Sequence, residues 1–173
     1  MKSLVVYSSL TGNTKMVAEA VAEVLMPDCT LCRVEDEPDF AGYDLVAVGY
    51  WVDRGTADKK AADYLVRIKN SKVALFVTIG ADPKSEHASK SVANGIAMLD
   101  ASNKLMGTFI CQGKIDPKLI ESMSKMFPPD HPHGMNEARI ARHKAASTHP
   151  DAGDLKAAKA VFQEIRAQIE DKS

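Results

Sequence analysis

Short runs of apolar residues alternate along this chain with segments whose apolar residues recur every three or four positions. The runs fall at residues 4–7, 30–34, 45–49, 73–78 and 106–112. Continuous apolar runs of this length are typical of strands buried on both faces of a parallel sheet. The periodic segments fall at 13–26, 61–68, 86–99, 117–126 and 154–170, and their spacing predicts amphipathic helices.

The order of these elements indicates the fold class. Five strands alternating with helical segments predict an α/β fold with a parallel sheet and right-handed crossovers. The last helix has the clearest pattern, because its apolar residues keep spacings of three and four throughout. These residues are Leu155, Ala158, Phe162, Ile165 and Ile169.

The loop after the first run carries the most distinctive polar pattern in the chain. Residues 8–14 read Ser-Ser-Leu-Thr-Gly-Asn-Thr and supply four hydroxyls, one amide side chain and one glycine. The loop enters a predicted helix, whose N-terminus offers unpaired N–H groups and a partial positive charge to an anion. Hydroxyls can donate to phosphate oxygens, and Gly12 lets the backbone approach closely. An ordinary N-cap is the alternative interpretation, although a cap needs only one such residue.

Composition excludes several classes of protein. The 173 residues are 45% hydrophobic and 26% charged, an ordinary balance for one globular domain. With 22 basic and 23 acidic side chains the net charge is −1, so nothing indicates a nucleic-acid or membrane-surface partner. No apolar run approaches the ~20 residues that a bilayer requires, and no signal peptide precedes the first run. We therefore expect a cytoplasmic monomer.

The cysteines Cys29, Cys32 and Cys111 do not suggest a disulfide framework, because their number is odd and no secretion signal is present. Cys29 and Cys32 form a C-x-x-C in the second predicted strand, where positions i and i+3 point to opposite faces. We expect these thiols to pack in the core or at an edge, and not to form a redox or metal site.

A specific motif spans the polar loop. After a first strand at the N-terminus the chain reads Ser9-Leu10-Thr11-Gly12-Asn13-Thr14, which fits [Ser/Thr]-x-Thr-Gly-x-Thr. It is neither a Walker loop nor G-x-G-x-x-G. It resembles the FMN-phosphate loop of the flavodoxin family, and the order of elements is similar over most of the chain. The resemblance implies a three-layer, doubly wound, five-stranded parallel sheet of order 2-1-3-4-5, in a single flavodoxin-like domain over residues 1–173.

The resemblance further implies FMN as the cofactor, bound in the crevice outside the carboxyl ends of the first and third strands. Trp51, the only tryptophan, follows the third run and offers a flat apolar face for the ring, with a surface aromatic as the alternative. The expected cofactor-binding residues of the first loop are Ser9, Leu10, Thr11, Gly12, Asn13 and Thr14. Those of the other two loops are Trp51, Val52, Gly55, Thr78, Ile79 and Gly80.

One feature departs from the family pattern. Many flavodoxins place a tyrosine in the third loop, where it stacks on the outer face of the ring, but no Phe, Tyr or Trp occurs here from residue 78 to 100. The outer face is therefore open, covered by another segment, or reserved for a partner or substrate.

Residues 127–153 form a segment that five strands and five helices do not require. Four histidines lie in it, namely His131, His133, His143 and His149, but their spacing fits no common metal motif. The readings left open are a surface loop, a metal site, and a lid or docking surface near the flavin. Residues 137–144 would form a short basic helix with Arg139, Arg142 and Lys144, either solvated or facing an acidic partner or a phosphate.

The resemblance implies an FMN-binding electron carrier that shuttles electrons between redox partner proteins, a reductase and an acceptor. An FMN-dependent NAD(P)H oxidoreductase, or an accessory subunit of a reductase, is the alternative, because the net charge lacks strong acidity and the second aromatic is missing. A flavin-free binding module on the same fold is a third reading. The sequence shows no constellation of catalytic residues and no metal site on which we would base a prediction.

Overall fold

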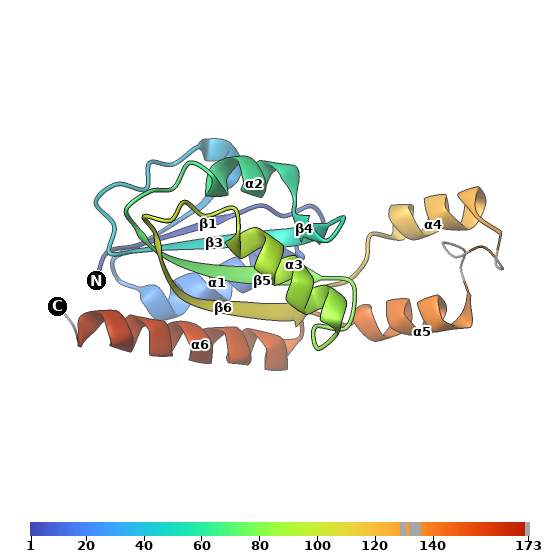
Figure 1. The fold of residues 1–173 in the computed structure, drawn as a ribbon. Helices are drawn as coiled ribbons and strands as arrows, with labels where there is room; N and C mark the ends of the chain where they lie inside the picture. Colours follow the sequence, from blue (N-terminus) through green and yellow to red (C-terminus); the bar gives the residue numbers. More distant parts are fainter. Residues whose placement is uncertain (129–130, 132–135, 172–173) are drawn as a thin grey trace.

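Five parallel strands form the centre of the molecule in the computed structural model, which describes residues 1–128, 131 and 136–171 (Figure 1). Their order is β2-β1-β3-β5-β6, and the short strand β4 pairs antiparallel with the end of β3. The bounds are β1 (Ser3–Tyr7), β2 (Cys29–Arg33), β3 (Leu45–Asp53), β4 (Thr56–Ala57), β5 (Lys72–Ile79) and β6 (Lys104–Gln112). The predicted α/β class and the order 2-1-3-4-5 are confirmed, with β4 accounting for the shift in numbering.

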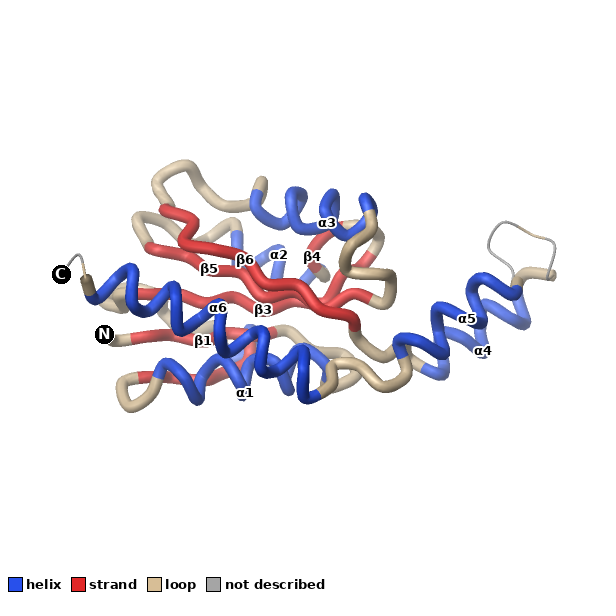
Figure 2. The backbone as a smooth tube through the Cα atoms, turned by 90° about the horizontal axis from the view of Figure 1, so that it is seen from below, coloured by secondary structure: helices blue, strands red, loops and turns tan. Residues whose placement is uncertain are grey.

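Helices cover both faces of the sheet. Helices α1 (Asn13–Leu25) and α6 (Ala152–Glu170) lie on one face, and α2 (Lys59–Leu65) and α3 (Glu86–Ile96) lie on the other (Figure 2). A short 3-10 turn, η1 (Val34–Asp36), follows β2. Among the described residues, no helix combines the length and the apolar character that crossing a bilayer requires.

Each strand supplies alternate side chains to two separate cores, as the period of two demands. In β1, Val5 packs with α1 and α6, whereas Val6 packs on the side of α2. The sequence predicted opposite faces for Cys29 and Cys32, and this is confirmed: Cys29 packs against the first core and Cys32 against the second. Both lie in β2, which is an edge strand.

Most predicted boundaries lie within three residues of the observed ones, with one exception that affects the site. The sequence ended the third strand at Gly49 and placed Trp51 and Val52 in a loop, but β3 continues to Asp53. The extension forms because residues after Tyr50 pair with β4 through a tight turn in which Arg54 and Gly55 have φ of 49° and 82°. Two consecutive residues with positive φ are typical of the hairpin turns that match strand twist.

Two further helices project beyond the carboxyl ends of the strands (Figures 1 and 2). These are α4 (Pro117–Met126), which was predicted, and α5 (Glu137–Ala146), which matches the basic helix predicted over 137–144. We call this pair of helices the arm. Asp116 precedes α4, and its carboxylate accepts the N–H of Lys118 at 2.9 Å.

Candidate functional site

The ends of four parallel strands and the loops next to them meet at one cavity of about 310 Å³ at the carboxyl edge of the sheet. The loops follow β1, β5 and β6, the last residues of β3 form a further wall, and the arm closes one side. Eight of the predicted cofactor-binding residues line the cavity, and these are Leu10, Thr11, Asn13, Trp51, Val52, Thr78, Ile79 and Gly80. The cavity therefore lies where the sequence predicted, but it is not lined by four of the predicted residues, namely Ser9, Gly12, Thr14 and Gly55.

The loop before α1 gathers backbone N–H groups. The N–H groups of Gly12 and Lys15 donate to Ser9 Oγ at 3.1 and 3.3 Å. In the described part of the chain, the N–H groups of Asn13 and Thr14 in the first helical turn have no acceptor. Gly12 has φ of 90°, a conformation that glycine adopts without strain, and open space surrounds it. This donor set fits an anionic group at the helix N-terminus.

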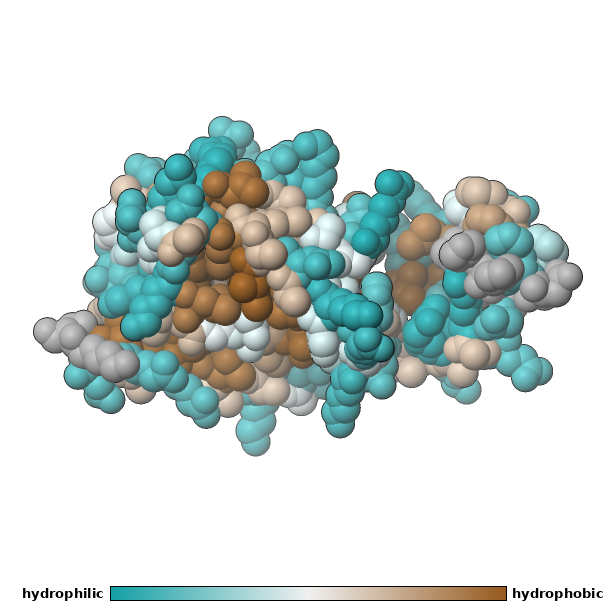
Figure 3. Space-filling model, in the orientation of Figure 1, coloured by the Kyte–Doolittle hydropathy of each residue, from teal (hydrophilic) through white to brown (hydrophobic). Residues whose placement is uncertain are grey.

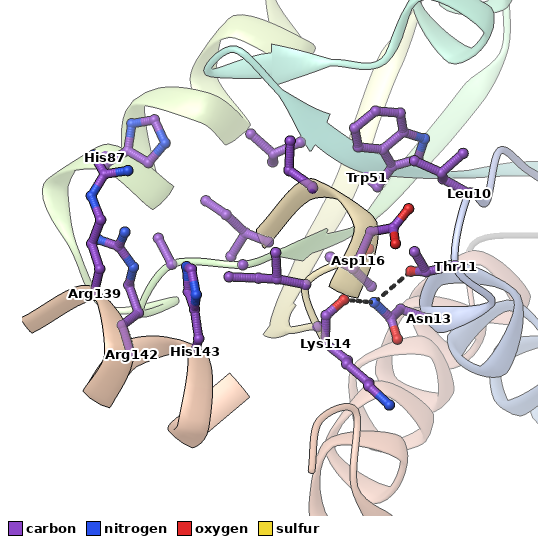
Figure 4. Close-up of a pocket in the computed structure, with 18 residues that line it drawn as sticks. Leu10, Thr11, Asn13, Trp51, His87, Lys114, Asp116, Arg139, Arg142 and His143 are labelled. Atoms are coloured by element: carbon purple, nitrogen blue, oxygen red, sulfur yellow. Dashed lines mark hydrogen bonds between the residues drawn. The ribbon is translucent and has the colours of Figure 1, made fainter. Parts of the chain in front are cut away.

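Two side chains of this loop hold it against neighbouring strands. Asn13 Nδ2 donates to Thr11 Oγ1 at 3.0 Å and to the carbonyl of Lys114 at 2.8 Å, which joins the loop to the segment after β6 (Figure 4). Thr14 is buried, and its hydroxyl is 2.9 Å from that of Thr78 in β5. The Thr14 hydroxyl therefore faces the core in this structure, and its bond to Thr78 fixes α1 on the sheet.

Trp51 lies across the cavity from Thr11 and Asn13 (Figure 4). It is half-buried in the extended part of β3. Strand pairing with β5 therefore fixes the backbone that carries the indole. Gly55 lies in the β3–β4 turn near His87 of α3, and its carbonyl accepts Asn94 Nδ2 at 2.8 Å. Gly55 therefore shapes the turn that carries the strand extension.

Sequence reasoning missed a buried polar pair next to this loop. Ser8 Oγ donates to Asp58 Oδ1 at 2.7 Å, and both residues are 3% exposed. Asp58 also caps α2 through the N–H of Ala61, and its Oδ2 has no partner among the described residues. Burial raises the pKa of Asp58 above its ordinary value. An Asp directly before a helical segment was a detectable cap signal, but its contact with Ser8 depends on the fold.

The arm contributes cationic side chains to the opposite end of the cavity. Arg139, Arg142 and His143 of α5 line it, together with His87 of α3 (Figure 4). The predicted basic helix is confirmed, but Lys144 does not line the cavity. Burial lowers the pKa of His143, and the nearby charges of Arg142 and Arg139 lower it further.

His131 and His149 do not line this cavity. His131 stacks on Phe127 with ring centroids 4.6 Å apart, and His133 falls outside the described residues. Within the described residues one group has ligand atoms close enough for a metal, namely His149, Asp151 and Asp154. Asp151 and Asp154 form the reciprocal capping box of α6, and Asp154 Oδ2 is 2.5 Å from His149 Nδ1. Asp151 Oδ1 and Asp154 Oδ2 therefore already accept hydrogen bonds from backbone N–H groups at the start of α6.

Comparisons with known sequences agree with this geometry. The family described as the flavodoxin domain matches residues 4–163. The flavodoxin-like domain-containing protein BilS of Clostridioides difficile (strain CD3) is 35% identical over 161 residues, covering 90% of each chain. The protein of the same name from Clostridium symbiosum (strain WAL-14163) is 28% identical over 174 residues, covering 91% of this chain and 92% of its own.

A comparison with solved structures supports the fold. Oxidised flavodoxin 2 from Bacillus cereus superimposes with a TM-score of 0.61 at 16% identity, over 97% of this chain and 99% of its own. At this level of identity the likeness concerns the fold, with the strand order described above.

Proposed function

Because this chain belongs to the flavodoxin domain family, we propose that it binds FMN in the cavity and carries electrons between redox partner proteins. One observation carries the proposal: a single cavity is lined both by Trp51 and by Thr11 and Asn13 at the start of α1, where the N–H of Asn13 has no acceptor among the described residues. A flavin mononucleotide needs both features, an anion site for its phosphate and a flat apolar surface for its ring.

At the phosphate end, the chain would bind through dipoles and hydroxyls. The N–H groups of Asn13 and Thr14 have no acceptor among the described residues and lie at the positive end of α1. The hydroxyls of Ser9 and Thr11 lie in the same loop and can donate to phosphate oxygens. The bond from Asn13 to the Lys114 carbonyl keeps this loop in place.

At the ring end, Trp51 would orient the flavin and apolar neighbours would exclude water. The cavity wall there includes Val52 and Ile79. The backbone of Gly80 lies at the same edge, and a Cβ at Gly80 would come within 2.7 Å of the Ile115 side chain, so only glycine leaves this space. Bound FMN would supply the one- and two-electron redox chemistry, and the protein would supply binding and orientation.

The thiols do not offer a competing redox centre. Burial raises the pKa of Cys32 to about 11, and the neighbouring charge of Asp36 adds to the rise. Burial also raises the pKa of Cys29, and it raises that of Cys111 to about 12. A thiol must be deprotonated to react, so these cysteines are poorly suited to exchange at neutral pH.

Comparing FMN with riboflavin tests the proposal, because the two ligands differ only in the phosphate. We expect FMN to bind at least about tenfold more tightly, since charge-assisted hydrogen bonds are worth roughly 1.5–3 kcal/mol. Replacing Thr11 (Thr11→Ala) should reduce this preference, whereas Thr108→Ala, at an exposed position of β6 outside the cavity, should leave it unchanged. Equal affinities for FMN and riboflavin in the unsubstituted chain would contradict a phosphate site at this loop.

A second candidate, an FMN-dependent NAD(P)H oxidoreductase, is favoured by one observation. The cavity continues past Trp51 to the arm, and its described lining there contains no second Phe, Tyr or Trp. A small substrate would have access to the ring from that side. Bleaching of bound flavin by NADPH alone, in the absence of oxygen, would support the enzyme; reduction only through a reductase protein would support the carrier.

A further inference from the structure

A second cavity, of about 200 Å³, lies next to the loop before α1. Its lining includes Ser8, Ser9 and Asp58. Leu10 and Trp51 line both this cavity and the larger one. The proposed FMN site uses the larger cavity and leaves the second without a role.

Asp58 connects the two elements that would hold FMN. Its Oδ1 accepts a hydrogen bond at 2.7 Å from Ser8 Oγ, directly before Ser9 of the loop. Its backbone N–H donates to the carbonyl of Trp51 at 3.1 Å. The N–H of Ser8 donates to the carbonyl of Gly49 in β3 at 2.9 Å. Asp58 therefore holds the loop before α1 against the strand that carries the indole.

The second cavity is rich in charged side chains. Figure 3 shows apolar surface gathered over the face that carries β6, where Leu105 is 39% exposed. By contrast, five of the nine residues that line the second cavity are Asp, Glu or Lys. Electrostatic interactions therefore dominate its effect on a neighbouring ligand.

The cations of this cavity already have partners other than Asp58. The charged residues that line it beside Asp58 are Glu35, Asp53, Lys59 and Lys60. Lys60 pairs with Glu35 at 2.7 Å. Lys59 pairs with Asp63 at 2.8 Å. In the described part of the chain, no Lys or Arg pairs with Asp58.

The surroundings of Asp58 favour its neutral form. The residue is 3% exposed, and its Oδ2 has no partner among the described residues. Burial raises the pKa of Asp58, and the hydrogen bond from Ser8 opposes this rise. When the carboxyl ionises, a negative charge without a cationic partner appears beside a loop whose N–H groups suit an anion.

We propose that Asp58 is a positioning residue for FMN: its carboxyl holds the loop before α1 against the strand that carries Trp51, and its ionisation weakens binding of the FMN phosphate. The inference rests on the proposed function, since it requires this phosphate in the loop. Ligand binding and proton binding are reciprocally linked, so the affinity for FMN falls as pH rises through the pKa of Asp58.

The pH profile of FMN affinity, measured by flavin fluorescence on the full chain, tests the inference with Asp58→Asn. Asparagine keeps an acceptor for Ser8 and a helix cap but carries no charge. Because the phosphate of FMN also titrates, the quantity compared is the affinity of the variant divided by that of the unsubstituted chain. This ratio should be near one at the acid end and rise about fivefold or more at the alkaline end. Riboflavin, which lacks the phosphate, should show no such rise.

Three further variants separate the charge from the hydrogen bonds. Ser8→Ala removes a bond that favours the ionised carboxyl, so the loss of FMN affinity should move to higher pH. Asp58→Ala removes the acceptor for Ser8 as well as the charge, and it should bind FMN more weakly than Asp58→Asn at every pH. Asp63→Asn makes the same chemical change in α2 outside both cavities and should keep the profile of the unsubstituted chain.

Different results would overturn different parts of the inference. A ratio that does not change with pH, an equal rise for riboflavin, or an equal rise in Asp63→Asn would each exclude the effect of the Asp58 charge on the phosphate. Equal FMN affinities of Asp58→Ala and Asp58→Asn would exclude the positioning role. In all these cases FMN binding would still support the proposed function. If the chain takes up no FMN at any pH, the proposed function and the inference fail together.

Discussion

At the scale of single residues, the most constrained group near the site is the buried carboxyl of Asp58. Its Oδ1 accepts a hydrogen bond from the Ser8 hydroxyl at the start of α2, while Oδ2 lacks a partner in the described part of the chain. Burial, the largest cause, favours the neutral form and raises the pKa. The carboxyl therefore contributes stability below its unfolded pKa, near 3.8, and this contribution is lost as pH rises through the folded pKa.

Replacing this carboxyl by an amide should change how stability depends on pH. Asp58→Asn keeps an acceptor for Ser8 and a helix cap, but it cannot ionise. We expect its free energy of unfolding, relative to the unsubstituted chain, to rise with pH above 3.8. Urea unfolding over a pH series measures this. Asp58→Ala also cannot ionise, but it leaves the Ser8 hydroxyl unpaired, so it should be about 1–3 kcal/mol less stable than Asp58→Asn at any pH in the series.

Asp100 provides a control, because its contribution to stability should depend on pH in the opposite direction. It is exposed, and the backbone N–H of Ser102 lowers its pKa. Its contribution is present above its unfolded pKa and is lost as pH falls through the lowered folded value. The stability of Asp100→Asn relative to the unsubstituted chain should therefore fall with rising pH. If the Asp58 and Asp100 variants respond to pH in the same direction, the buried-carboxyl account is wrong.

At the scale of elements, the packing of α3 on β3 depends on one glycine. A Cβ at Gly95 would lie 2.1 Å from the hydroxyl of Tyr50, which is fully buried. That hydroxyl has no hydrogen-bond partner among the described residues, so it contributes bulk without a polar contact. Because β3 carries Trp51 immediately after Tyr50, the fit of this helix affects the wall of the cavity.

Gly95→Ala should destabilise the chain by about 1–3 kcal/mol, because the added methyl group overpacks a filled interface. Tyr50→Phe alone should be nearly neutral or stabilising, since it removes a buried hydroxyl that lacks a partner. Combining the two should recover part of the loss, because the ring Cζ of residue 50 would still lie 2.8 Å from the methyl group, and denaturant unfolding of all three variants gives the coupling. Strictly additive effects would show that the hydroxyl is not what excludes the methyl group.

The elements were largely predictable because their signals are local. Continuous apolar runs and helical spacing depend only on neighbouring residues, so β1, α4 and α6 were found close to their observed bounds. The extension of β3 was missed because it requires pairing with β4 across the Arg54–Gly55 turn. That pairing depends on backbone geometry, which the composition of residues 50–57 does not reveal.

At the scale of the whole molecule, one face of the sheet is closed by the two helices farthest apart in sequence. Phe162 of α6 is fully buried and meets Phe76 of β5 edge-on, with ring centroids 6.0 Å apart. Arg166 of α6 donates to the carbonyls of Val24 and Met26 at 3.1 and 2.9 Å, which fixes the end of α1. The C-terminal helix is thus part of the core that supports the loop before α1.

Phe162→Ala should cost about 3–5 kcal/mol, because it leaves a cavity between α6 and the sheet. Ile140→Ala on the arm, where the side chain is 52% exposed, should change stability by no more than about 0.5 kcal/mol. Thermal and urea unfolding of the two variants provide the comparison. A small effect of Phe162→Ala would mean that α6 is not an integral part of the cooperative fold.

The site was predictable only in part, because several of its contacts join segments that are far apart in the sequence. The family motif identified the loop at Ser9–Thr14, and the strand order brought Trp51 opposite to it. The Ser8–Asp58 pair and the placement of Arg139 and Arg142 in the same cavity arise from contacts between distant segments. A basic helix in sequence does not reveal which way its side chains face.

The fluorescence of Trp51 during a titration with FMN tests the central claim most directly, because this is the only tryptophan in the chain. We predict that its emission is strongly quenched and that quenching saturates at one FMN per chain, with Trp51→Phe still binding FMN more weakly through the phosphate loop. FMN binding without quenching would place the cofactor elsewhere. Absence of FMN binding would contradict the proposed function itself.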